Sequence, residues 1–169
     1  MHPLEQAMSE DGFVLIGDSS DGHFPATSFH VYTLAGKRFY CLDLGGLTES
    51  RGSSAGRRVY ATVADLPAER SDLALIWVSK ETARRAVEAA HEAGCRRVWF
   101  SFMTTEPGAV DRARELGLEI VELGRCPVAY LQREQVPTGC RIHMGSMKLT
   151  GTWQKPPQTD AGVRRRELV

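Results

Sequence analysis

The feature that most constrains the fold is an alternation of short apolar runs with longer segments of helical character. The apolar runs lie at residues 13–16, 38–44, 73–78, 97–102 and 118–123, and helical segments between them lie at 25–35, 81–93 and 107–116. Helices that follow buried strands in this order are typical of βαβ units, which join parallel strands. The sequence therefore predicts an α/β domain in three layers, with a mostly parallel central sheet between helices.

The charge balance and the absence of a long apolar segment limit the partners of this chain. Lysine plus arginine number 21, as do aspartate plus glutamate, so the formal net charge is zero. A neutral chain lacks the overall positive field that nucleic-acid binding uses. No apolar run reaches the length of a membrane span, and residues 1–11 lack a secretory apolar core. We therefore expect a cytoplasmic protein with reduced cysteines and a small-molecule ligand, without nucleic acid or membrane partners; a homo-oligomer is left open.

A change in composition near residue 135 separates the expected domain from a C-terminal extension. The length of 169 residues suits one domain with a proper core, which we place at residues 1–134. Residues 135–169 form the extension. It is turn-rich up to residue 145, carries a short helix at 143–149 and has a mobile end from Lys155 onward.

The candidate ligand site follows from the parallel sheet, because ligands bind beyond the carboxyl ends of such strands. The first strand ends in Gly17, Asp18, Ser19 and Ser20. A glycine there allows close approach of a ligand, and the following N–H groups and hydroxyls can hold phosphate oxygens. The alternative is an ordinary polar turn, and the two aspartates, Asp18 and Asp21, oppose an anion.

Lys80, which follows the third strand, offers a positive charge close to that turn. It can offset the aspartates, or it can be a solvated residue at the start of the next helix, which is the more common role of a surface lysine.

A set of short segments, in order and spacing, carries a family resemblance. They lie at residues 14–19 (VLIGDS), 25–31, 59–67 (VYATVADLP), 71–73, 93–99 (AGCRRVW), 113–118 (ARELGL) and 125–127 (RCP). In this order they resemble the small stand-alone CoA-binding proteins, which are related to the CoA-binding domain of succinyl-CoA ligase. The resemblance covers about residues 13–130. The tail around residues 142–151 also looks like the ending of some longer members.

The resemblance implies a Rossmann-like fold and a role in binding CoA or an acyl-CoA, with no catalysis and with an open regulatory role. It places Gly17 and Ser19 at the phosphates, and Asp43 and Leu44 beside the adenosine. The remaining implied contacts line the nucleotide or pantetheine path or lie close by: Trp77, Val78, Ser79, Ser101, Met103 and Cys126.

The chain departs from the family pattern at several of these places. The usual Gly-Ala-Ser is Gly17-Asp18-Ser19, and the Asn-Pro that often closes the second strand is Asp43-Leu44. An arginine that commonly ends the next strand is Val78, and residues 101–103 replace a Gln-Xaa-Gly. Because charge-assisted bonds to phosphate are strong, their loss bears on ligand identity more than on fold.

Other functions remain as alternatives. Asp43 lies about 26 residues beyond Gly17, near the expected place of a ribose-binding acid, which favours a nicotinamide-dependent oxidoreductase or redox sensor. The Gly-Xaa-Gly-Xaa-Xaa-Gly motif of that class is missing, however. An interaction module is the other alternative, with Trp153 and the basic residues 164–166 as docking elements or as a solvated tail.

Cysteine chemistry gives two weaker hypotheses. Cys126 follows Arg125, which can lower a thiol pKa and activate a nucleophile, whereas a buried structural cysteine is the more common case. Cys126, Cys140 and His143 can be imagined around a metal, but their irregular spacing and the lack of a clear fourth ligand argue against it. We therefore expect no metal site and no catalytic residue.

Overall fold

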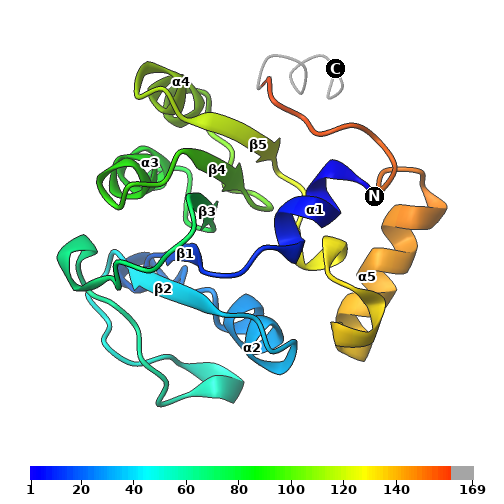
Figure 1. Cartoon of the computed structure of the whole chain (residues 1–169), viewed down its shortest axis with the longest axis horizontal. Coiled ribbons are helices and arrows are strands. Elements are labelled where there is room, and N and C mark those ends of the chain that lie inside the picture. Colours follow the sequence, from blue (N-terminus) through cyan, green and yellow to red (C-terminus); the bar gives the residue numbers. More distant parts are fainter. Residues whose placement is uncertain (161–169) are drawn as a thin grey trace.

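The computed structural model describes residues 1–160, and a five-stranded parallel sheet lies at its centre (Figure 1). The strands are β1 (Phe13–Gly17), β2 (Phe39–Asp43), β3 (Leu73–Ile76), β4 (Arg97–Phe100) and β5 (Glu119–Leu123). They lie in the order β2-β1-β3-β4-β5. The predicted α/β, Rossmann-like fold with a parallel sheet is confirmed.

The strand order creates a switch point at β1. The chain passes from β1 to β2 on one side and then returns to β3 on the other side of β1. In the register, Gly17 is paired with Asp43, and Ile16 with Ile76. The carboxyl ends of β1, β2 and β3 therefore meet at one edge, which is where ligands bind in open parallel sheets.

Helices cover both faces of the sheet. The helices α3 (Ala83–Glu92) and α4 (Pro107–Glu115) pack on one face, against side chains such as Ile16, Ile76 and Phe100. On the other face lie α1 (Pro3–Ser9), α2 (Ala26–Leu34) and α5 (Thr138–Leu149), around Leu15, Leu75 and Trp99 (Figure 1). Because alternate residues of each strand enter different apolar clusters, every central strand is buried on both faces.

The helix α5 is longer than the sequence predicts. Pro137, Gly139 and Gly145 indicate turns, yet the helix begins at Thr138 and includes both glycines. Met144 and Met147 lie on its inner side and are buried in the apolar cluster around Trp99. Tertiary burial therefore overrides weak local helix propensity here.

The segment after α5, residues 153–158, is hydrogen-bonded to β5 and to the residues that follow it. The Trp153 indole N–H donates to the carbonyl of Ala129 at 3.0 Å, and its ring stacks on Tyr130. The backbone of residues 155–158 accepts from Arg125 and donates to Glu122. The division at residue 135 stays a prediction, and the basic residues 164–166 lie outside the described part of the chain. Within residues 1–160, no helix has both the length and the apolar character needed to cross a membrane.

Candidate functional site

The parallel sheet brings the predicted site residues to one edge, at the carboxyl ends of the strands. β1 supplies Gly17 and the turn after it, β2 supplies Asp43 and Leu44, and the turn after β3 begins at Trp77. Ser101 and Met103 follow β4, and Cys126 follows β5. Within this edge, the polar residues around β1 and the residues beyond β4 and β5 form two distinct groups.

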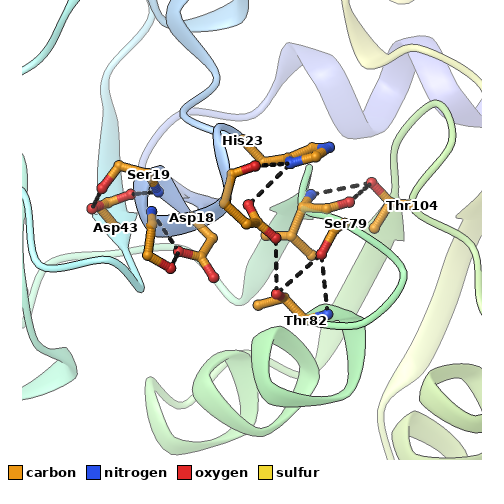
Figure 2. Close-up of polar contacts among 10 residues, drawn as sticks. Asp18, Ser19, His23, Asp43, Ser79, Thr82 and Thr104 are labelled. Atoms are coloured by element: carbon orange, nitrogen blue, oxygen red, sulfur yellow. Dashed lines mark hydrogen bonds and ion pairs between the residues drawn. The ribbon is translucent and has the colours of Figure 1, made fainter.

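Two aspartates hold the turn after β1 through its serines (Figure 2). Asp18 accepts hydrogen bonds from the Ser20 N–H at 3.0 Å and the Ser20 hydroxyl at 2.5 Å. Asp43 accepts from the Ser19 N–H at 2.8 Å and the Ser19 hydroxyl at 2.6 Å, and also from the Leu47 N–H at 2.8 Å. Both carboxylates are buried, with 2% of Asp18 and 0% of Asp43 exposed.

This arrangement does not fit a phosphate group. The N–H groups and hydroxyls of Ser19 and Ser20 are the donors that a phosphate would need, and all four already donate to carboxylates. A phosphate that entered would have to break these bonds and lie beside buried negative charge. The predicted phosphate contacts at Gly17, Ser19 and Ser20 therefore stay a prediction that requires this turn to rearrange.

Gly17 has a packing role at the start of this turn. A Cβ atom on Gly17 would lie 2.3 Å from the Pro25 Cδ and 2.9 Å from the His23 carbonyl oxygen. The space beside Gly17 is therefore filled by the chain itself, and a side chain there would push the entry to α2 away from β1.

We expect Gly17→Ala to lower the free energy of unfolding by about 1–3 kcal/mol, because overpacking forces the backbone to shift. Gly145→Ala is the control, since a Cβ there meets nothing within 4 Å. It lies inside α5 and should raise the same free energy by about 0.5–1 kcal/mol. Urea unfolding followed by circular dichroism measures both; equal effects of the two variants would contradict the packing role of Gly17.

The turn after β3 is polar and is hydrogen-bonded to the turns after β1 and β4 (Figure 2). The Val78 N–H donates to the Thr104 hydroxyl, which in turn donates to the Val78 carbonyl. Asp21 accepts from the hydroxyl of Thr82, and His23 lies 3.0 Å from the Asp21 carboxylate. Burial opposes the charge of Asp21, but hydrogen bonds from Ser79, His23 and Thr82 outweigh it and hold the pKa of Asp21 below its usual value. The carboxylate therefore stays ionised and adds to the negative charge beside the first turn.

A cavity of about 410 Å³ opens at the carboxyl ends of β4 and β5. Three predicted site residues line it: Lys80, Met103 and Cys126. Its other walls come from the loops after these strands, from α5 and from the chain that follows α5: Phe102, Thr105, Gly124, Arg125, His143, Met147 and Thr152. A volume of this size is in the range of small-molecule sites.

The loop after β4 carries two unusual features at this cavity. Met103 has a φ of 60°, the left-handed region that non-glycine residues rarely adopt, and its side chain is 69% exposed. The hydroxyl oxygen of Thr105 is buried and has no hydrogen-bond partner within the described residues. Backbone strain and unpaired buried polar atoms both concentrate at functional sites, so this loop is the strongest candidate for ligand contact.

Cys126 lies on the cavity wall as a partly buried thiol. Burial raises its pKa, against hydrogen bonds from the backbone of Val128 and Ala129. Arg125 does not activate it, because that guanidinium binds Glu122 and Tyr130. The thiol is therefore protonated near neutral pH and is a poor nucleophile. In the part of the chain that the structure describes, no group of three or more His, Cys, Asp or Glu residues could hold a metal.

The sequence selects three of the ten residues that line the cavity as ligand contacts. It predicts a strand that continues through Phe102, whereas β4 ends at Phe100, and it places Thr105 beyond that strand without choosing it as a contact. His143 and Met147 reach the cavity because α5 packs against the turn Pro127–Tyr130 that follows β5. The replacement of a Gln-Xaa-Gly by residues 101–103 was the one available signal that this loop is distinctive.

Comparison with known proteins points to one family. The model for the CoA binding domain matches residues 13–132. A hypothetical protein from Pyrococcus horikoshii OT3 is similar at 25% identity, with a TM-score of 0.58 over 75% of this chain and 86% of that one. A conserved hypothetical protein from Pyrococcus furiosus is similar at 18% identity, with a TM-score of 0.53 over 66% and 91% of the two chains.

A larger enzyme shares the fold. The dinucleotide-forming acetyl-coenzyme A synthetase 1 of Ca. Korarchaeum cryptofilum is 15% identical, with a TM-score of 0.51 over 69% of this chain and 27% of that one. Identities of this size show a common fold alone. Among curated proteins, none matches this sequence.

Proposed function

Because the chain belongs to the CoA-binding domain family, we propose that it binds CoA or an acyl-CoA at the carboxyl edge of its sheet and leaves the ligand chemically unchanged. The observation that carries the proposal is the cavity at the ends of β4 and β5, which lies within this edge and contains three of the residues predicted to contact the ligand. A nucleotide end of the ligand would extend from there toward β1 and β2.

The chemistry of the cavity suits a pantetheine arm. Phe102, Met103 and Met147 give it apolar walls, and the arm is largely aliphatic. The arm also contains amide groups, and the unpaired Thr105 hydroxyl is a buried partner for one of them. Lys80 adds a positive charge at the wall, and the lining residues include no carboxylate.

The state of Cys126 supports binding without catalysis. It is the thiol on the cavity wall, and its raised pKa keeps it protonated. A protonated thiol does not attack a thioester at a useful rate, since the thiolate is the nucleophile. An acyl group in the cavity would therefore remain on its carrier.

Isothermal titration with CoA, acetyl-CoA, NAD and ATP in parallel tests the proposal. We expect CoA or acetyl-CoA to bind with a dissociation constant on the order of micromolar, and acetyl-CoA to be recovered intact after prolonged incubation. Binding of NAD in preference to CoA would replace the proposal with a nicotinamide-linked function. Hydrolysis of acetyl-CoA by the wild type would overturn its non-catalytic part.

Thr105→Val separates a ligand contact from a structural role. The substitution removes a buried hydroxyl that has no partner within residues 1–160, so we expect the free energy of unfolding to stay unchanged or rise by about 1 kcal/mol. CoA affinity should fall by about threefold to tenfold, the worth of one hydrogen bond. Thr104→Val is the matched control, because its hydroxyl bonds both backbone groups of Val78 and its loss should lower stability. Unchanged CoA affinity in Thr105→Val would remove this threonine from the site.

A further inference from the structure

Resting on the proposed function, we infer that Asp18 and Asp43 set the ligand specificity of this chain: they close the first turn to a diphosphate, so that recognition falls on the pantetheine arm. The ligand class is then a pantetheine thioester, bound with little contribution from the nucleotide diphosphate.

The first step is that all four donors of Ser19 and Ser20 already have acceptors. Asp18 takes both donors of Ser20, and Asp43 takes both donors of Ser19 (Figure 2). Each serine thus contributes one N–H and one hydroxyl to a carboxylate at 3.0 Å or less. The two carboxylates occupy the turn in the way that anionic oxygens of a ligand would.

The second step is the absence of room at the same donors. The backbone of Gly45, just after β2, lies against the turn, and a Cβ on Gly45 would be 2.4 Å from the Ser19 hydroxyl and 2.6 Å from the Ser20 nitrogen. The donors therefore face the chain itself. A diphosphate could reach them only if the segment after β2 moved away and two buried carboxylates lost their partners.

The third step is charge. Asp18, Asp21 and Asp43 surround the turn, and the hydrogen bonds to Asp21 keep it ionised. Negative charge in a partly buried setting repels a diphosphate more strongly than the same charge in open solvent. The cavity beyond β4 and β5 differs in this respect, since the exposed Lys80 lines it and no carboxylate does.

The test compares CoA with pantetheine, which lacks the nucleotide and its diphosphate. Both are titrated into the wild type, Asp18→Ala, Asp18→Asn and Asp21→Ala. We expect the wild type to bind the two ligands within about threefold of each other. Asp18→Ala frees the donors of Ser20 and should raise the ratio of CoA affinity to pantetheine affinity by about tenfold, the worth of one or two charge-assisted hydrogen bonds.

The other two variants distinguish two causes of a change in this affinity ratio, the release of the Ser20 donors and the loss of a negative charge. Asp18→Asn keeps a side-chain acceptor for Ser20 and removes the charge, so its ratio should lie between those of the wild type and Asp18→Ala; it also carries the test if Asp18→Ala does not fold. Asp21→Ala removes one negative charge from the same turn without freeing Ser19 or Ser20. Its ratio should rise, but by clearly less than that of Asp18→Ala, because charge is removed and no donor is freed.

Three results would overturn the inference. A wild type that prefers CoA over pantetheine by more than about tenfold, with an unchanged ratio in both Asp18 variants, leaves the proposed function standing and removes the specificity role. An equal rise in Asp21→Ala and Asp18→Ala shows that net charge, and not donor occupancy, controls the ratio. If neither the wild type nor any variant binds CoA or pantetheine, the proposed function and this inference are both removed.

Discussion

Arg125→Met is expected to lower the free energy of unfolding by about 3–5 kcal/mol, because it leaves a buried carboxylate without its cation. Glu122 is 0% exposed, and its Oε2 lies 3.0 Å from the Arg125 guanidinium, of whose side chain 6% is exposed. The Arg125 guanidinium also donates to the Tyr130 hydroxyl at 2.9 Å. One side chain therefore neutralises a buried charge and satisfies several acceptors.

The same guanidinium forms hydrogen bonds with the segment that follows α5. It donates to the carbonyls of Thr152, Lys155 and Pro156, while the Gln158 N–H donates to Glu122. Loss of Arg125 should consequently free residues 152–158 from the sheet edge as well as destabilise the core. Limited proteolysis of the variant should show early cleavage in this segment, and urea unfolding gives the free energy.

Arg114→Met is the matched control for this prediction. Arg114 also holds the tail, through the Thr159 carbonyl, but its side chain is 45% exposed and its partners Asp111 and Asp160 are exposed too. An exposed pair of this kind contributes about 0–1 kcal/mol. A double variant, Glu122→Gln with Arg125→Met, should be more stable than Arg125→Met alone, since no unpaired charge remains. If Arg125→Met costs no more than Arg114→Met, the buried pair does not have this role.

Strand positions could be predicted because their signal is local. Residues 13–16 form a continuous apolar run ending at Gly17, and β1 is buried at every position. The strong helix at 81–93 was also evident from its small apolar residues, and α3 lies within it. The length of the C-terminal helix α5 was underestimated. Its glycines weaken the local helix signal, and the burial of Met144 and Met147 is decided by tertiary contacts.

The meeting of the candidate residues at one edge was predictable, but their hydrogen bonding was not. Parallel strands place their carboxyl ends at one edge, so the candidate residues were expected to meet there. The bond between Asp43 and Ser19 joins residues 24 positions apart and depends on the register that pairs Gly17 with Asp43. The sequence places Asp18 and Asp21 in the turn, but only the strand register shows that Asp43 occupies the donors of Ser19.

The second large effect is expected at Trp99, in the centre of β4. Its side chain is 0% exposed and lies among the apolar residues of the face covered by α1, α2 and α5, in edge contact with the ring of Tyr130. Its indole N–H donates to the Arg125 carbonyl at 2.8 Å. The ring therefore fills the core and also positions the residue that binds Glu122.

Trp99→Ala should lower the free energy of unfolding by about 3–5 kcal/mol, since it opens a large cavity where the surrounding backbone cannot collapse. Trp99→Phe keeps most of the ring but loses the N–H, so the Arg125 carbonyl loses its donor and a smaller cost of about 1–3 kcal/mol is expected. Trp77→Ala is the control, because Trp77 is partly exposed at the sheet edge and contacts the ring of His23. Urea unfolding followed by circular dichroism avoids the change in fluorescence. A loss in Trp77→Ala equal to that in Trp99→Ala would show that burial in this core does not decide the stability.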